Sequence, residues 1–102
     1  MKPTTKTPDG TSFHDSTFDC SVAILRKILG EPDYECNDGS DKTNFDWTAE
    51  TDNGDVFTVY DWKEYRPLSE NEVVQWHVGG HSRSVTEQAR REIKKAISKM
   101  LR

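Results

Sequence analysis

The sequence predicts an α+β fold in which three antiparallel strands form a meander and two helices, one N-terminal and one C-terminal, pack on one face of it. Three patterns lead to this prediction: apolar residues at helical spacing near the N-terminus, alternating and β-branched runs in the middle, and a long amphipathic stretch at the C-terminus. Helices stacked on one side of an antiparallel sheet are the simplest layered arrangement for the order α-β-β-β-α. The chain has 102 residues, so we expect a single domain over residues 13–102, preceded by a flexible N-terminal arm over residues 1–12.

The first helix is predicted to begin near Phe18 and to end at Leu29. Its apolar positions recur every three or four residues and form one stripe, which consists of Phe18, Val22, Ile24, Leu25, Ile28 and Leu29. Ser16 is a candidate N-cap, because a serine hydroxyl can accept a hydrogen bond from a free N–H of the first turn. Gly30 and Pro32 follow the stripe and are typical of a helix end.

Three strands are predicted between residues 44 and 78. Residues 44–51 alternate between apolar and polar side chains, as in a half-exposed strand, and the apolar face consists of Phe45, Trp47 and Ala49. Asp52-Asn53-Gly54 favours a turn into residues 56–62, whose β-branched and aromatic residues on both faces predict a central strand. Residues 73–78 predict a third strand, with one face formed by Val74, Trp76 and Val78.

The C-terminal stretch predicts the longest helix. Ser84 and Glu87 have the spacing of a capping box, in which the two side chains satisfy N–H groups at a helix start. The apolar stripe that follows consists of Val85, Ala89, Ile93, Ala96, Ile97 and Met100. The opposite face is basic and carries Arg90, Arg91, Lys94, Lys95, Lys99 and Arg102. Positive charge near the C-terminal end also suits the helix dipole.

Charge is distributed unevenly along the chain, although the formal net charge is only −4. Residues 1–80 carry 16 acidic and seven basic side chains, whereas residues 81–102 carry two acidic and seven basic ones. The segment 31–61 contains ten carboxylates and Lys42 as its single basic residue. An acidic surface can imitate a nucleic-acid backbone and a basic helix can bind one, but such runs are also typical of solvated faces.

The composition indicates a cytoplasmic protein with a small core. Apolar residues make up 32% of the chain, no continuous apolar stretch is long enough for a membrane helix, and the N-terminus lacks a secretion signal. A domain of this size buries a modest share of its surface, so a homo-oligomer or a bound ligand is a reasonable source of further stability. We expect Cys20 and Cys36 to be reduced thiols.

No catalytic or metal-binding constellation is evident, and the sequence favours a binding protein over an enzyme. His77 and His81 are separated by two glycines and do not share a helix face, and neither cysteine has a partner at zinc spacing. The acidic loop that ends at Asn44 lacks the bidentate glutamate of a calcium loop. We therefore expect no metal and no cofactor.

A candidate ligand site combines the second and third strands with the turn before the last helix. If these strands are adjacent, their aromatic and polar side chains meet near a glycine pair whose backbone an anion can approach. Aromatic faces stack on bases, and basic side chains neutralise phosphates. The candidate ligand-binding residues are Tyr60, Trp62, Lys63, Arg66, Trp76, His77, Gly79, Gly80, His81 and Arg83. The alternative is that the aromatic members fill the core, which aromatic side chains commonly dominate.

Several motifs occur in a defined order: Asp9-Gly10-Thr11-Ser12-Phe13, Leu29-Gly30-Glu31-Pro32, Trp47, Asp52-Asn53-Gly54, Val59-Tyr60-Asp61-Trp62-Lys63 and Trp76-His77-Val78-Gly79-Gly80. Together they resemble, over most of residues 9–97, a family of small tailed-phage proteins without a known activity. Two departures from that family are a longer loop after Lys63 and the His14-Asp15 pair. The resemblance implies a phage origin and action in the host cytoplasm, and it implies no particular chemistry.

A phage origin favours a protein that counters host defence by binding a host component. The leading hypothesis is sequestration of a nucleotide-like immune signal, with a base stacked on Trp62 and on Trp76 or Tyr60. Phosphates would be held by Lys63, Arg66, His81 and Arg83. The alternative is an inhibitor of a host defence protein, whose acidic segment 31–61 occupies a nucleic-acid site. Direct nucleic-acid binding by the last helix is less favoured, because overall acidity opposes phosphate contacts.

Overall fold

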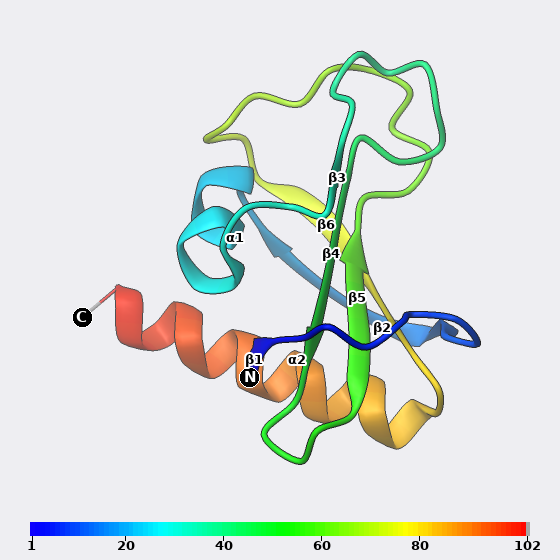
Figure 1. Ribbon diagram of the computed structural model, residues 1–102. Helices are drawn as coiled ribbons and strands as arrows, with labels where there is room; N and C mark the ends of the chain where they lie inside the picture. The colour runs from blue at the N-terminus through cyan, green and yellow to red at the C-terminus, as the bar shows by residue number, and fades with distance from the viewer. Residues whose placement is uncertain (102) are drawn as a thin grey trace.

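The computed structural model describes residues 1–101 and contains one antiparallel sheet and two helices (Figure 1). The strands are β1 (Lys2–Pro3), β2 (Ser12–Cys20), β3 (Tyr34–Glu35), β4 (Phe45–Glu50), β5 (Val56–Tyr60) and β6 (Val74–Gly80). The helices are α1 (Val22–Leu29) and α2 (Arg83–Met100). The strand order is β1-β4-β5-β6-β2, and β3 also pairs with β4. The predicted α+β class is confirmed.

The three predicted strands correspond to β4, β5 and β6, and the central position predicted for β5 is confirmed. Gly54 in the turn between β4 and β5 has a φ of 85°, the left-handed conformation that glycine adopts without strain. The sheet is nevertheless larger than the predicted three-stranded meander. Strand β2 extends it beyond β6, and β1 and β3 extend it beyond β4, so the order of elements is not α-β-β-β-α.

The prediction of a helix from Phe18, capped by Ser16, is wrong. Phe18 lies in β2, opposite Trp76 of β6, and α1 begins only at Val22. Ser21 is the N-cap, and its hydroxyl accepts a hydrogen bond from the N–H of Ile24. Residues 16–20 fit both a helical and an alternating pattern, and pairing with β6 decides between them because it satisfies the backbone and buries alternate side chains.

The N-terminal segment, predicted as an arm over residues 1–12, contacts the sheet. Lys2 and Pro3 form the strand that pairs with the end of β4, and the ammonium group of Lys6 donates to the carbonyl of Gly54. Residues 8–12 then cross toward β6 along the sheet, so that Ser12 lies opposite Gly80. The segment 1–12 therefore forms one side of the domain surface.

Both helices begin one or more residues away from their predicted caps. In α2 the N-cap is Ser82, whose hydroxyl accepts from the N–H of Val85, so the predicted capping box of Ser84 and Glu87 is wrong. Glu87 instead forms an ion pair with Arg83 on the helix surface. The predicted end of α1 is confirmed, because Gly30 is its C-cap with a φ of 84°. Within residues 1–101, neither helix is long and apolar enough to cross a membrane.

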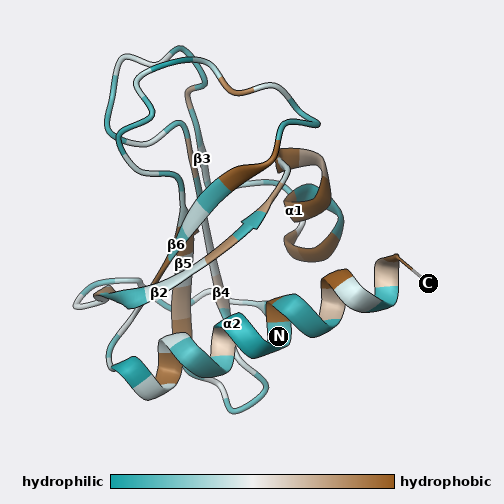
Figure 2. Cartoon of the chain, turned by 180° about the vertical axis from the view of Figure 1, so that it is seen from behind, coloured by the Kyte–Doolittle hydropathy of each residue, from teal (hydrophilic) through white to brown (hydrophobic). Residues whose placement is uncertain are grey.

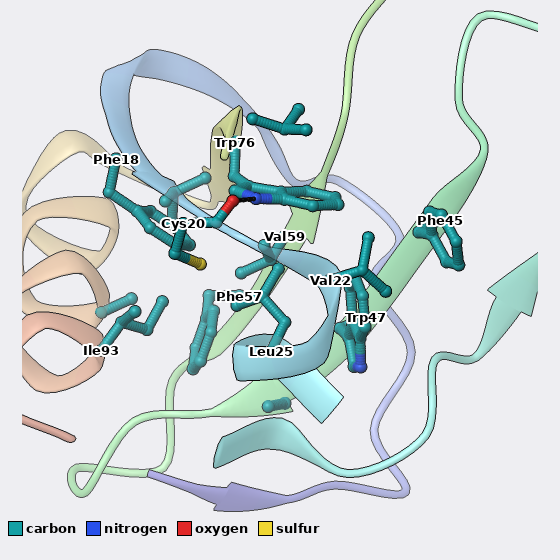
Figure 3. Close-up of a cluster of buried hydrophobic side chains, with 14 of the residues drawn as sticks. Phe18, Cys20, Val22, Leu25, Phe45, Trp47, Phe57, Val59, Trp76 and Ile93 are labelled. Atoms are coloured by element: carbon teal, nitrogen blue, oxygen red, sulfur yellow. Dashed lines mark hydrogen bonds between the residues drawn. The ribbon is translucent and has the colours of Figure 1, made fainter. Parts of the chain in front are cut away.

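The core lies between one face of the sheet and the two helices (Figure 3). Trp47 and Trp76 are almost fully buried there and contact each other edge to face, with ring centroids 5.6 Å apart. Their indole N–H groups donate to the carbonyls of Gly30 (2.8 Å) and Cys20 (2.9 Å), so burial leaves neither donor without a partner. The other core side chains include Phe18, Val22, Leu25, Phe45, Phe57, Val59, Val78, Ala89 and Ile93.

Two long loops, residues 36–44 and 61–73, pack together at the end of the sheet where β5 ends (Figure 1), and Figure 2 shows that they are mostly hydrophilic. The side-chain amide of Asn37 donates to the carbonyl of Leu68 at 2.8 Å and accepts from its N–H at 2.7 Å. A Cβ atom on Gly39 would lie only 2.6 Å from the Cα of Arg66. The loops therefore form one packed lobe rather than two separate excursions.

Asp61 connects this lobe to the sheet. Its carboxylate is fully buried and accepts hydrogen bonds from the backbone N–H groups of Asn44 and Phe45 at 2.8 and 2.9 Å. The side-chain amide of Asn44 donates to the same carboxylate at 3.0 Å and to the carbonyl of Arg66 at 3.0 Å. Asp61 thus fixes the position at which the chain leaves β5 relative to the start of β4.

We expect Asp61→Asn to lower the free energy of unfolding by roughly 2–4 kcal/mol, because the amide nitrogen would face N–H donors and leave buried groups unpaired. Urea unfolding of the variant and the unmodified protein measures the difference. Asp55→Asn is the control, because Asp55 is exposed. Equal midpoints for Asp61→Asn and the unmodified protein would contradict this role of Asp61.

Candidate functional site

The face of the sheet opposite the helices carries a row of aligned side chains. The strand register pairs Tyr34 with Asp46, Asp46 with Tyr60, Tyr60 with His77, and His77 with Thr17. Directly paired residues of antiparallel strands point to the same side of a sheet, and their immediate neighbours along each strand point to the other side. We call the side that carries this row the open face, because the helices pack against the opposite side.

An aromatic cluster lies on the open face and consists of Phe13, Tyr60, Trp62 and His77. Phe13 stacks on His77 with ring centroids 4.4 Å apart, and Tyr60 lies 5.6 Å from His77 and 6.1 Å from Trp62. The side chains of Trp62 and Phe13 remain 41% and 39% exposed. Burial lowers the pKa of His77, which favours the uncharged form of its ring. The cluster is therefore a neutral aromatic surface that remains accessible.

Two lysines lie beside the exposed indole of Trp62. The ammonium groups of Lys42 and Lys63 lie 5.9 and 5.5 Å from the ring centroid, which is the range of a cation–π contact. The N–H of Lys63 donates to the carbonyl of Lys42 at 2.7 Å, so the backbone holds the two residues side by side. Neither lysine forms an ion pair with a carboxylate in residues 1–101. Both charges can therefore turn toward an anion.

A hollow of about 330 Å³ opens beside the aromatic cluster. We call it the open-face hollow, and it is lined by Pro8, Thr11, Ser12, Thr43, Asp46, Thr58, Tyr60, Trp62 and Gly79. Gly79 keeps part of this space open, because a Cβ atom there would lie 2.5 Å from the hydroxyl oxygen of Thr58. The hollow is therefore bounded by an aromatic wall, a polar wall and the N-terminal segment.

Asp46 is the only titratable carboxylate that lines the open-face hollow in the described part of the chain. Its Oδ1 atom is buried and has no hydrogen-bond partner. The pKa of Asp46 is raised to about 6. Burial is the largest cause, and the negative charges of Asp33 and Asp61 add to it. The charge of Asp46 also raises the pKa of Tyr60, although burial is the larger cause. This carboxylate is thus ionised at neutral pH without a compensating partner.

The structure brings together five of the predicted ligand-binding residues. Tyr60, Trp62 and His77 belong to the aromatic cluster, Lys63 lies beside Trp62, and Gly79 lines the open-face hollow. Gly80 lies at the end of β6, where a Cβ atom would approach the side chains of Val85 and Thr86 in α2. Gly79 therefore lies at the open-face hollow, whereas Gly80 lies against α2.

The remaining predicted residues lie elsewhere. Trp76 is fully buried on the core side of the sheet, so it is not available to stack on a ligand at the open face. Arg66 forms ion pairs with Glu64 and Glu72 in the loop lobe, and Arg83 pairs with Glu87 on α2. His81 follows β6 and lies next to Gly10. Since Lys63 follows β5 and Arg83 follows the antiparallel β6, they lie at opposite ends of the sheet and do not form one phosphate site.

Sequence reasoning missed Phe13, Lys42 and Asp46. Phe13 reaches the aromatic cluster because β2 pairs with β6 and the register shifts between Phe13 and Thr17, where Asp15 has a φ of 66°. Lys42 reaches it only through the packing of the loops. For Asp46 a signal was available, because the alternation of β4 places it on the face opposite Phe45 and Trp47.

Other features of the described residues give no better site. A hollow of about 410 Å³ lies beside Met1, but its carboxylates, Asp52 and Glu92, already pair with the N-terminal ammonium group. Cys20 and Cys36 are free thiols, and burial raises the pKa of Cys20 to about 12. Within residues 1–101, no group of three or more metal-ligating side chains is close enough to hold a metal ion.

We expect Asp46→Asn to stabilise the protein at pH 7.5. The pKa of Asp46 is higher in the folded state than its usual 3.8, so the folded state binds the proton more tightly. The contribution of Asp46 to the free energy of unfolding therefore falls as the pH rises from about 4 through 6, and the amide variant lacks this loss. The gain at pH 7.5 should be on the order of 1–2 kcal/mol, because water screens a partly exposed carboxylate.

Urea unfolding at pH 4 and pH 7.5 measures this effect as the difference between variant and unmodified protein at each pH. Groups that titrate in both proteins cancel in this difference. Asp55→Asn serves as the control, because it removes one exposed carboxylate. A variant that is no more stable than the unmodified protein at pH 7.5 would show that Asp46 has a partner in solution.

Polar and aromatic side chains line one exposed hollow, and two lysines contact Trp62 in its wall. A concave surface with a few polar groups is the usual form of a small-molecule site. Comparisons with protein-family models, with curated proteins and with solved structures found no match to this chain.

Proposed function

We propose that this protein binds a nucleotide-like small molecule at the open-face hollow and acts by sequestering it. The observation that carries the proposal is the exposed indole of Trp62, which contacts the ammonium groups of Lys42 and Lys63 and also lines a hollow of about 330 Å³. A nucleotide has the same two parts, a planar base and an anionic phosphate. The proposed role is binding without catalysis.

The aromatic wall supplies a stacking surface for the base. Trp62 and Tyr60 both line the hollow, and His77 supports Tyr60 from the next strand. Because Tyr60 and His77 are held by the sheet register, the surface is formed before any ligand arrives. Stacking of a base on an aromatic side chain contributes about 1–3 kcal/mol. A preformed surface retains more of this energy, since little side-chain freedom is lost on binding.

The lysine pair supplies the anion-binding end of the site. Lys42 and Lys63 rest against Trp62 through cation–π contacts that are weak at exposed positions. A phosphate offers each ammonium group a charge-assisted hydrogen bond, which is stronger than a neutral one. The lysines are therefore expected to leave the indole and contact the phosphate when a nucleotide binds.

The proposed biological role follows from the resemblance to small phage proteins. In an infected cell, a protein that holds a nucleotide-like immune signal would keep that signal from the defence enzymes it activates. The concentration of free signal falls as more binding sites become available. Sequestration therefore needs an abundant protein with high affinity for the signal, and it needs no catalytic turnover. The proposed role is therefore counter-defence in the host cytoplasm.

The alternative of an acidic inhibitor has less support from the structure. Most of the ten carboxylates in the segment 31–61 already have partners within the domain. Glu31 and Glu35 pair with Arg26, Glu50 pairs with lysines of the N-terminal segment, and Asp61 is buried. A nucleic-acid mimic needs a continuous run of unpaired charge, and these contacts interrupt it.

We expect linear or cyclic nucleotides to raise the Tm of the protein by several degrees. A ligand present at 100 times its Kd adds about 2.7 kcal/mol to the stability of the folded state. The test is a thermal-shift screen, followed by calorimetric titration of each nucleotide that raises the Tm. Trp62→Ala should weaken binding by roughly 5-fold to 100-fold, since the stacking surface is lost. No shift with any nucleotide would contradict the proposal and direct the search to a protein partner.

The lysine pair has a matched control. The double variant Lys42→Ala with Lys63→Ala should weaken binding by about 10-fold or more, because two charge-assisted hydrogen bonds to phosphate are lost. Lys27→Ala removes a lysine from the last turn of α1, away from the hollow, and should leave the Kd unchanged. Equal weakening by both would indicate a nonspecific charge effect.

A further inference from the structure

Asp46 gives the open-face hollow a chemical preference that neither the aromatic wall nor the lysine pair provides. An ionised carboxylate accepts hydrogen bonds and cannot donate one. Its Oδ1 atom has no partner within residues 1–101, and the side chain forms part of the wall of the hollow. The Oδ1 atom is buried, so a base stacked on Trp62 reaches this acceptor once the Asp46 side chain turns toward the hollow.

The surroundings of Asp46 do not satisfy this acceptor. The charged side chains that raise the pKa of Asp46 are those of Asp33 and Asp61, and both are also acidic. Asp33 accepts a hydrogen bond from the N–H of Thr48, and Asp61 accepts from the loop backbone, so both are already satisfied. Across the sheet, Asp46 is flanked by Tyr34 of β3 and Tyr60 of β5. No cationic side chain in the described residues forms an ion pair with Asp46.

We propose that Asp46 selects guanine as the base bound in the open-face hollow. This inference rests on the proposed function. Guanine presents two adjacent N–H donors, its ring N1–H and its exocyclic amino group, and a carboxylate can accept from both. Adenine and cytosine present a donor next to an acceptor, whose lone pair would face the charge of Asp46. A site built to accept hydrogen bonds discriminates strongly against ligands that cannot donate them.

The phosphate end agrees with this orientation. Trp62 contacts both lysines and lines the hollow together with Asp46, so a base stacked on it can direct its sugar and phosphate toward the lysines and its hydrogen-bonding edge toward Asp46. Thr58 and Thr43 line the same hollow and carry hydroxyl groups that can donate to the carbonyl oxygen of guanine. The ligand class is therefore a guanine nucleotide, linear or cyclic.

The experiment compares three nucleotides that differ only in the base edge. Guanosine, inosine and adenosine 5′-monophosphates are titrated calorimetrically into the protein at pH 7.5. The inosine nucleotide lacks the exocyclic amino group and should bind about 10-fold more weakly than the guanosine nucleotide. The adenosine nucleotide lacks both donors in this arrangement and should bind more weakly still. This comparison needs no variant, so it remains decisive whatever a substitution does to folding.

Two variants then assign the preference to Asp46. Asp46→Asn keeps the shape but presents a donor and an acceptor, so guanosine and inosine nucleotides should bind within about twofold of each other. Asp33→Asn removes a neighbouring negative charge while its amide oxygen can still accept from Thr48, and it should retain the guanine preference. A thermal melt confirms that each variant is folded.

The outcomes separate this inference from the proposed function. A guanine preference that Asp46→Asn abolishes and Asp33→Asn retains is the expected result. Equal binding of all three nucleotides would overturn the guanine inference and leave nucleotide binding intact, as would a preference that Asp46→Asn does not change. If none of them binds and no nucleotide of the thermal-shift screen raises the Tm, the inference and the proposed function both fail.

Discussion

The candidate site depends on the register between β5 and β6, in which Val59 lies opposite Val78 and Tyr60 lies opposite His77. The two pairs point to opposite sides of the sheet. The valines therefore contribute to the core, and the tyrosine and histidine contribute to the open face. A slip of one residue would reverse both assignments. Burial of the valines and of Trp76 makes such a slip costly, and the hydrophobic core thereby also specifies the geometry of the open face.

The ends of the strands need a second constraint, because side chains beyond the last paired residue are not positioned by the sheet. Trp62 and Lys63 follow β5 directly, and the buried carboxylate of Asp61 holds this part of the chain against Asn44 and Phe45. The backbone contact between Lys42 and Lys63 continues the same connection. Although Asp61 is not part of the hollow, it positions the residues that are, in the way that supporting hydrogen bonds commonly position a binding site.

The parts of the fold that were predictable from sequence are those with one clear periodicity. Alternation in β4 and β6 and the turn at Gly54 identified the central strands and the buried side of each. Strand β2 was missed because Phe18 and Val22 fit a helical stripe as well as they fit a strand followed by a helix, and only pairing with β6 distinguishes the two. Local patterns carry no information about such long-range pairing.

The candidate site was only partly predictable for the same reason. Tyr60, Trp62, Lys63 and His77 lie on adjacent strands, so a local motif and one assumption about pairing brought them together. Phe13 comes from the bulged edge strand β2, Lys42 from a loop, and Asp46 from β4, which pairs with β5 on the side away from β6. Their convergence therefore depends on the whole sheet. Trp76 was misplaced because it was grouped with His77, although neighbours in a strand face opposite sides of the sheet and alternation puts Trp76 with Val74 and Val78 on the buried side.

Asp46 is difficult to explain as a structural residue. In the adjacent row of the open face, β4 and β5 carry the neutral pair Thr48 and Thr58, which shows that this surface accepts uncharged β-branched side chains. Such residues favour strands, whereas aspartate is depleted there, and a buried acceptor without a partner costs stability. Natural proteins retain destabilising groups mainly where function uses them. The sheet has no need of a carboxylate at this position, whereas the proposed nucleotide ligand would supply the hydrogen-bond donors that Asp46 lacks.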